Sequence, residues 1–271
     1  MKLFKLYSLL FILITGFLFS CSESDPQADP TAGLIKITEG YALGAGAKVE
    51  LWAEEQPFTG YNQLFIALYD SVSKRRITEA HVHLHPLMTM MGGMQHACPV
   101  ESPEDENAVN KLFPAAAVFI MPSSDMGSWE LEVEVHNHDN GKEGSAEFEI
   151  TVTDPASPMM KSFVTTGEEK IFVSYLFPEK LKVGVNDFIV MAHHMEDMMN
   201  FPAVEDLTMI LTPEMPSMGH GSPNNVNPVH DAMGHYPGKV NFTMTGEWRL
   251  NLEIWRGDEL LEELYFDVTV E

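Results

Sequence analysis

The chain has 271 residues, 45% of them apolar, which is enough for about two domains with buried cores of their own. Its 16 lysines and arginines are outnumbered by 40 aspartates and glutamates, and the formal net charge of -24 excludes nucleic acid as a partner because such a surface repels phosphate. Two cysteines exclude a disulfide-rich framework, whereas 18 methionines and 11 histidines stand out.

The N-terminus has the pattern of a bacterial lipoprotein signal peptide. After a basic start, residues 6–19 form an apolar run, shorter than the roughly 17–25 residues that cross a bilayer. The run ends in the letters LFSC, which resemble a lipobox with Cys21 as the lipidated residue. We predict a signal peptide over residues 1–20, a flexible stalk over residues 21–32, and a lipid anchor in the outer membrane, on its periplasmic or its surface side. The alternative is an ordinary signal peptide cleaved near Ser20.

Beyond the stalk, one sequence pattern occurs twice. The corresponding segments are 60–66 and 184–190, 84–88 and 211–215, and 127–131 and 246–250. The spacing predicts two tandem repeats, over residues 33–155 and 159–271.

Within each repeat, apolar and polar residues alternate. Residues 129–135 place an apolar residue at every second position between acidic ones, and residues 248–254 repeat this period. Alternation with period two is typical of half-buried antiparallel strands, and no long helical period is present. The sequence therefore predicts an all-β protein of two immunoglobulin-like antiparallel β-sandwich domains, with Trp129 and Trp248 in their cores.

Methionine and histidine concentrate in three windows, residues 86–98, 191–199 and 213–235. These windows hold 11 of the 18 methionines and six of the 11 histidines, a clustering that filling gaps in a core does not explain. The candidate ligands there are Met88, Met91, Met94, His96, Met215, Met218, His220, His230, Met233 and His235. We expect the donors of each repeat to gather at one end of its sandwich.

Thioether sulfur is a soft, neutral donor that suits Cu(I), imidazole serves Cu(I), Cu(II) and zinc, and zinc makes little use of methionine. The donor set therefore favours copper. The alternative is an adaptable apolar surface that contacts a protein or a glycan and holds no metal. Cys98 is either a further ligand or an unpaired buried thiol.

A second candidate is the HVHLH segment at residues 81–85, in which the three histidines share the outer face of a predicted strand. Neighbouring same-face residues lie about 6.6–6.8 Å apart, so two of these histidines, such as His83 and His85, can share an ion with a third donor. His136 and His138 are candidate donors if their strand is the neighbour. The alternative is a solvated polar face.

No serine nucleophile elbow, phosphate-binding loop or zinc-protease signature is present, so we expect a binding protein and not an enzyme. A blue-copper centre needs a cysteine closely followed by histidine and methionine, whereas the first histidine after Cys98 is His136. The acidic residues of segment 101–106 lack the alternation and the glycine of a calcium loop, and we expect them to keep that loop in solvent.

The second repeat resembles the YtkA-like domain, a relative of FixH-type modules. The resemblance rests on MPSMGHG at 215–221, GHYPG at 234–238 and MTGEW at 244–248, and covers about residues 205–255. The first repeat matches only in part, since Gly92-Gly93 stands where the second has Gly-His. The resemblance implies an exported immunoglobulin-like domain associated with copper handling. Together with the lipobox and the Met/His loops, it leads us to expect a lipid-anchored copper scavenger, buffer or chaperone with a copper-handling protein partner.

Overall fold

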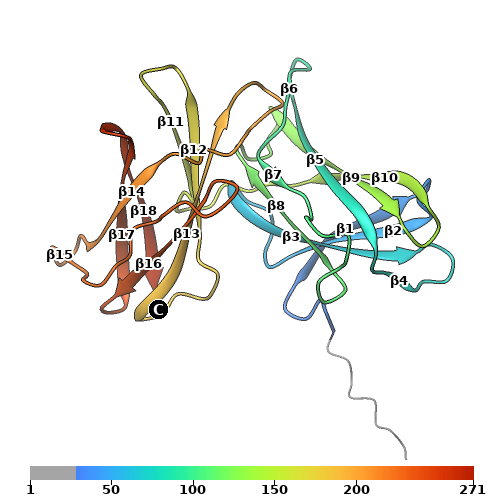
Figure 1. The fold of residues 1–271 in the computed structure, drawn as a ribbon, viewed down its shortest axis with the longest axis horizontal. Coiled ribbons are helices and arrows are strands. Elements are labelled where there is room, and N and C mark those ends of the chain that lie inside the picture. Colours follow the sequence, from blue (N-terminus) through green and yellow to red (C-terminus); the bar gives the residue numbers. More distant parts are fainter. Residues whose placement is uncertain (1–28) are drawn as a thin grey trace, which may run out of the picture.

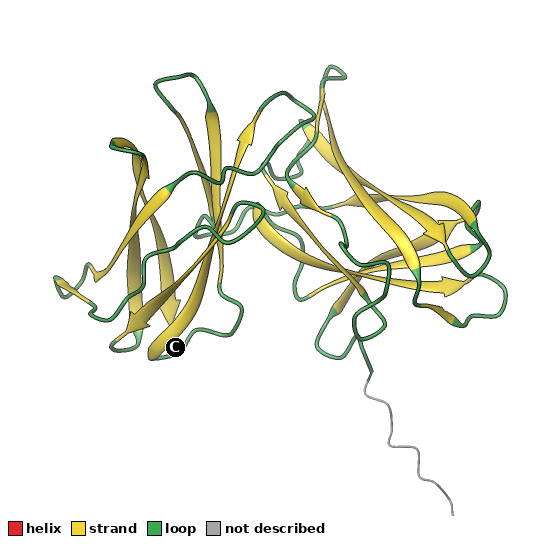
Figure 2. Ribbon diagram, viewed as in Figure 1, coloured by secondary structure: helices red, strands yellow, loops and turns green. Residues whose placement is uncertain are grey.

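The computed structural model describes residues 29–271, and the predicted signal peptide, Cys21 and most of the stalk lie outside them. The described residues form 18 strands and no helix (Figures 1 and 2), which confirms the predicted all-β class. It follows that none of them forms a helix suited in length and apolarity to crossing a membrane.

The first sandwich contains ten strands. They are β1 (Ile35–Ala42), β2 (Ala47–Ala53), β3 (Gly60–Asp70), β4 (Arg76–Ile77), β5 (Ala80–Met90), β6 (Gln95–His96), β7 (Val100–Glu101), β8 (Phe113–Phe119), β9 (Gly127–Asn137) and β10 (Lys142–Ile150). One sheet has the order β1-β2-β3-β8-β7, with β4 also pairing with β3, and the other has the order β10-β9-β5-β6. Side chains from both sheets form one core.

The second sandwich contains eight strands. They are β11 (Met160–Val164), β12 (Lys170–Leu176), β13 (Gly184–Met195), β14 (Thr208–Met215), β15 (His220–Gly221), β16 (His235–Phe242), β17 (Gly246–Arg256) and β18 (Glu259–Val270). The sheet orders β11-β12-β13-β16 and β15-β14-β17-β18 match those of the first sandwich, except that β4 and β7 have no counterpart. All ladders are antiparallel, as predicted from the period-two alternation.

The two tryptophans occupy the same place in the two cores. Trp129 and Trp248 are each 1% exposed and pack against Phe119 and Phe242, with ring centroids 5.1 and 5.5 Å apart. Each indole N–H donates to a backbone carbonyl, so the one polar atom of the ring is satisfied inside the core. The predicted core role of both tryptophans is confirmed.

On the free edge of β5, and on that of β14, a side-chain oxygen accepts a hydrogen bond from one backbone amide. The backbone N–H of Leu84 on β5 donates to Ser102 Oγ at 3.1 Å. At the equivalent position on β14, Leu211 N–H donates to Asn227 Oδ1 at 3.0 Å. Beyond these points each edge carries a strand of only two residues, β6 or β15.

The two sandwiches lie side by side and share a small apolar interface (Figure 1). Tyr61 of β3 and Val118 of β8 pack against Met191 of β13, which is fully buried. A backbone hydrogen bond of 2.8 Å from Ala97 to Met198 joins the domains next to this cluster. Relative domain position is therefore fixed by apolar burial and by backbone pairing.

Truncating Met191 should weaken this interface. We expect Met191→Ala to lower the free energy of unfolding by about 2–5 kcal/mol, the range for losing a buried methionine side chain. Urea denaturation followed by tryptophan fluorescence measures the change. Met126→Ala, at a methionine that is 54% exposed, is the control and should stay within about 0.5 kcal/mol of the parent. Equal losses in the two variants would contradict the assignment.

Candidate metal-binding sites

The first candidate site is a row of three side chains on the inner face of the β6-β5-β9 sheet. Met88 of β5 pairs in register with His96 of β6 on one side and with Trp129 of β9 on the other. Directly paired residues of antiparallel strands have Cβ atoms about 4.5–5.5 Å apart on the same face. The His96 and Trp129 rings meet edge to face with centroids 5.3 Å apart, and all three side chains are buried. We call this arrangement the first His–Met–Trp row.

His96 has the protonation pattern of a metal ligand. Its Nδ1 lies 2.9 Å from the carbonyl oxygen of Ala97, and because a carbonyl only accepts, Nδ1 carries the proton. Its Nε2 is buried and has no hydrogen-bond partner among residues 29–271. Neutral imidazole with one nitrogen fixed by a backbone carbonyl presents the other lone pair to a metal.

The second sandwich repeats the row. Met215 of β14 pairs in register with His220 of β15, and the His220 ring meets Trp248 edge to face with centroids 5.7 Å apart. Met215 and Trp248 are buried, whereas His220 is partly exposed. We call these residues the second His–Met–Trp row. Two sandwiches with little other identity in these loops thus bring the same three side-chain types together.

A glycine two residues before each tryptophan leaves room for the methionine. A Cβ on Gly127 would lie 2.9 Å from Met88 Cε, and a Cβ on Gly246 would lie 3.2 Å from Met215 Cε. Any larger residue there would push the thioether away from its row.

Three further predicted ligands lie at the exposed turns beside the rows. Met91, Met94 and Met218 are 68%, 59% and 61% exposed. Gly93 and Gly219 fold these turns back with φ angles of 82° and 61°, in the left-handed region that favours glycine. Thioethers are therefore available both in the core and in solvent at the same end of each sandwich.

The structure separates His230, Met233 and His235 from the row of their own sandwich. His235 begins β16, whereas Phe242, which packs on Trp248, ends it. Seven residues of strand span about 23 Å. The expectation that all donors of this repeat gather at one end is corrected, because the chain places only Met215, Met218 and His220 there.

His235 lies at the domain interface. Its Nε2 is 2.6 Å from Glu101 Oε1 of the first sandwich, and Tyr61 donates its hydroxyl to the other oxygen of Glu101 at 3.1 Å. The hydrogen bond to Glu101 raises the pKa of His235, whereas burial lowers the pKa of nearby His193 to about 4. Sequence reasoning missed Glu101 as a partner because no local motif links residues 134 positions apart.

The strand that carries His81, His83 and His85 is β5, and it pairs over its whole length with β9, the strand of the candidate donor His136. His83 and His85 alternate on the outer face, as expected, but their register partners are Glu134 and Glu132. His85 Nε2 lies 3.4 Å from Glu134 Oε2. These two histidines therefore face carboxylates and not other imidazoles, and no third donor joins them in the described part of the chain.

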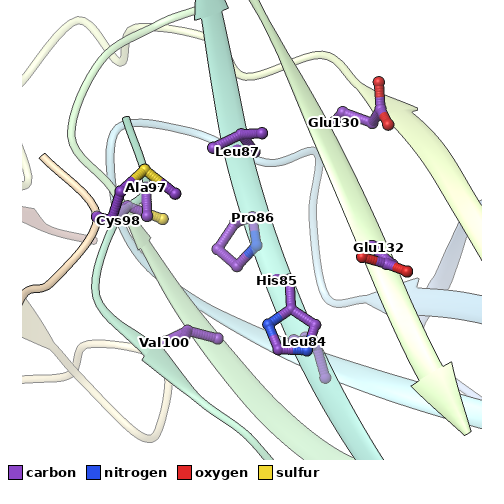
Figure 3. A pocket seen from close by; sticks show the side chains of 10 residues that line it. Leu84, His85, Pro86, Leu87, Ala97, Cys98, Val100, Glu130 and Glu132 are labelled. Carbon is purple, nitrogen blue, oxygen red and sulfur yellow. The ribbon is translucent and has the colours of Figure 1, made fainter. Parts of the chain in front are cut away.

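A pocket of about 240 Å³ lies over the same sheet (Figure 3). β5, with His85 and Pro86, runs between Cys98 on one side and Glu132 of β9 on the other. Cys98 is a free thiol that is 3% exposed, and burial raises its pKa well above the ordinary value. A protonated thiol is a poor metal ligand, so the alternative of a buried unpaired thiol describes Cys98 better.

The fold and these sites define a tandem β-sandwich protein with soft-donor loops. Residues 168–253 match the family model described as YtkA-like, so the second sandwich carries a YtkA-like domain, as its resemblance predicted. No curated protein matches the chain.

Solved structures with similar strand arrangements have low identity. Domains 5–6 of the S-layer protein SbsC are 10% identical with a TM-score of 0.31, covering 88% of this chain and 97% of that one. The Escherichia coli adhesin FdeC is 10% identical with a TM-score of 0.27, covering 89% and 82%. The Bacteroides ovatus protein SGBP-B, solved with a mixed-linkage heptasaccharide, is 15% identical with a TM-score of 0.18, covering 77% and 41%.

The two interface histidines predict opposite pH dependences of stability. The pKa of His193 is lowered to about 4, so between pH 6.5 and 4 the unfolded chain binds a proton at this position and the folded chain does not. The free energy of unfolding therefore decreases as the pH is lowered through this range, by about 3 kcal/mol in all. The pKa of His235 is raised, so its contribution is complete below about pH 6.5 and is lost as pH rises through the folded value.

We therefore expect His193→Gln to flatten the acid side of the stability profile and His235→Gln to flatten the alkaline side. Urea unfolding from pH 4 to 9 measures both differences from the parent protein. His83→Gln, on an exposed strand face, is the matched control and should leave the profile unchanged. Parallel profiles for all four proteins would refute the assignment.

Proposed function

We propose that this protein is a lipid-anchored, extracytoplasmic copper-binding protein that scavenges, buffers or delivers Cu(I) through its two His–Met–Trp rows. The observation that supports this most is the repetition: in each sandwich a methionine and a histidine pair across the same hairpin, and the equivalent tryptophan of the neighbouring strand meets the histidine ring. A core needs no histidine at that point, and in the first row the histidine keeps a buried lone pair without a partner.

The donor chemistry favours Cu(I) over harder ions. A thioether and a neutral imidazole carry no charge, and soft thioether sulfur selects Cu(I). The adjoining indole ring adds a π face or edge next to the cation, which an apolar environment strengthens. Zinc sites use thiolate, imidazole and carboxylate, and neither row holds a thiolate or a carboxylate.

The surroundings of the rows fit capture and release. Met91 and Met94 lie at the turn beside the first row and Met218 at the turn beside the second, all more than half exposed, so an ion from solvent meets an exposed thioether before it reaches the His–Met pair. A net charge of -24 concentrates cations around the molecule. A lipid on Cys21 and the following stalk would hold the protein at the outer membrane, within reach of a copper-handling protein partner.

Titration of a soluble form without the lipid anchor, residues 22–271, with Cu(I) against a competing chelator tests this proposal. We expect about two ions bound with sub-micromolar affinity, and loss of one ion in Met215→Leu with His220→Ala. Met209→Leu, another buried methionine on β14, is the matched control and should bind as the parent does. No retention of copper by the parent would overturn the proposal and favour the metal-free contact module.

A glycine substitution tests the first row without removing a ligand. In Gly127→Ala the new methyl group meets the end of the flexible Met88 side chain and must displace the thioether. We expect Cu(I) affinity at this site to fall about tenfold, equivalent to 1.4 kcal/mol, with little loss of stability. Gly167→Ala, where a Cβ meets only Thr165 Oγ1 at 3.8 Å, should change neither quantity. Unchanged affinity in Gly127→Ala would exclude Met88 as a ligand.

A further inference from the structure

Three histidines converge on the outer face of the first sandwich, away from both His–Met–Trp rows. His81 of β5 pairs directly with His136 of β9, and His138 follows the end of β9. One nitrogen from each ring can be chosen so that all three lie within 4.8 Å of one another. The ring centroids are 4.7 to 5.7 Å apart, so the imidazoles already form one compact group.

A carboxylate approaches the same group from a separate loop. Glu106 Oε1 lies 3.3 Å from His81 Nε2, and Glu106 Oε2 lies 3.7 Å from His138 Nδ1. Glu106 is 53% exposed, as we expected of this acidic segment, and its carboxylate also approaches two of the three imidazoles.

The loop that carries Glu106 is held in place by backbone pairing. The carbonyl of Glu106 accepts a hydrogen bond of 2.9 Å from Ala80 N–H, and Ala108 N–H donates to the Thr78 carbonyl at 2.9 Å. These two bonds, one at Glu106 and one two residues after it, hold this part of the loop against the beginning of β5. The carboxylate is therefore positioned by the fold and not by its charge alone.

Three neutral nitrogens and one carboxylate oxygen make a borderline donor set. Zinc takes imidazole nitrogen at about 2.0–2.1 Å in tetrahedral sites, which places ligand atoms roughly 3.3 Å apart. Imidazole-rich sites also bind Cu²⁺, which exceeds Zn²⁺ in intrinsic affinity. The side chains of His81 and His138 are 44% and 24% exposed, so their rings have solvent on one side into which they can turn toward a shared ion.

We propose that His81, His136, His138 and Glu106 form a binding site for a borderline divalent cation, Zn²⁺ or Cu²⁺. The three imidazoles supply neutral donors and Glu106 supplies the negative charge. The site differs in ligand chemistry from the Cu(I) rows and does not depend on them.

The site is separate from the first row in space as well. His81 and Met88 are seven residues apart on β5, or about 23 Å, and they lie on opposite faces of the sheet. The second sandwich has no equivalent, because Thr208 and Trp255 occupy the paired positions that correspond to His81 and His136. The divalent site therefore belongs to the first sandwich alone.

Titrations of the soluble form, residues 22–271, with Zn²⁺ and with Cu²⁺ against a chromophoric chelator test the site. We expect one divalent ion to bind, and affinity to fall at least about 100-fold in His136→Ala and about tenfold in Glu106→Gln. His83→Ala is the matched control, since His83 lies on the same face of the same strand outside the cluster. Electron paramagnetic resonance of the Cu²⁺ form should show hyperfine coupling to imidazole nitrogen that diminishes in His81→Ala.

The outcomes distinguish this site from the proposed Cu(I) function. Met215→Leu with His220→Ala should lose one Cu(I) ion and keep the divalent ion. His136→Ala should lose the divalent ion and keep both Cu(I) ions. His81 and Glu106 are exposed and His136 is partly exposed, so thermal unfolding without metal should change little. If neither Zn²⁺ nor Cu²⁺ binds, or if His136→Ala and His83→Ala bind the divalent ion with equal affinity, the proposal is overturned.

Discussion

The antiparallel pairing of β5 with β9, and of β14 with β17, is the constraint on which both kinds of site depend. In this register even-numbered residues of β5 point into the core and odd-numbered residues point to solvent, so Met88 meets Trp129 inside while His81 meets His136 outside. A slip of one residue would exchange the two faces and destroy both groups. The buried tryptophans make that slip costly, because a large side chain would leave the core.

The two faces also sort ligands by chemistry. Thioether and indole groups are apolar and can line the core, where they leave an uncharged site with little water. Carboxylates need solvent unless they are paired, and Glu106, which contacts the histidine cluster, accordingly lies on the outer face. One pair of strands can thus present a soft, uncharged donor set on its inner side and a borderline, charged set on its outer side.

The sequence predicted much of the fold because its information is local. Alternation over residues 129–135 and 248–254 fixed the strands, and the repeated segments identified two equivalent sandwiches. Sequence reasoning made His136 and His138 candidate partners of the histidine strand only on the condition that the two strands are neighbours, and β5 and β9 do pair. Contacts made by loops were out of reach: the Glu106 carboxylate and the Glu101–His235 pair are set by tertiary placement, and no spacing rule marks them.

On a membrane, where the proposed lipid anchor would hold the protein, the covered positions on the free edges of β5 and β14 would affect how neighbouring copies meet. An exposed strand edge offers unpaired amides to the same edge of a neighbouring copy, and tethering raises the local concentration at which such pairing occurs. Ser102 and Asn227 occupy an amide on β5 and on β14, and the two-residue strands that carry His96 and His220 cover the next positions. The hairpins that bring the histidines into place therefore also guard against self-association into extended sheets.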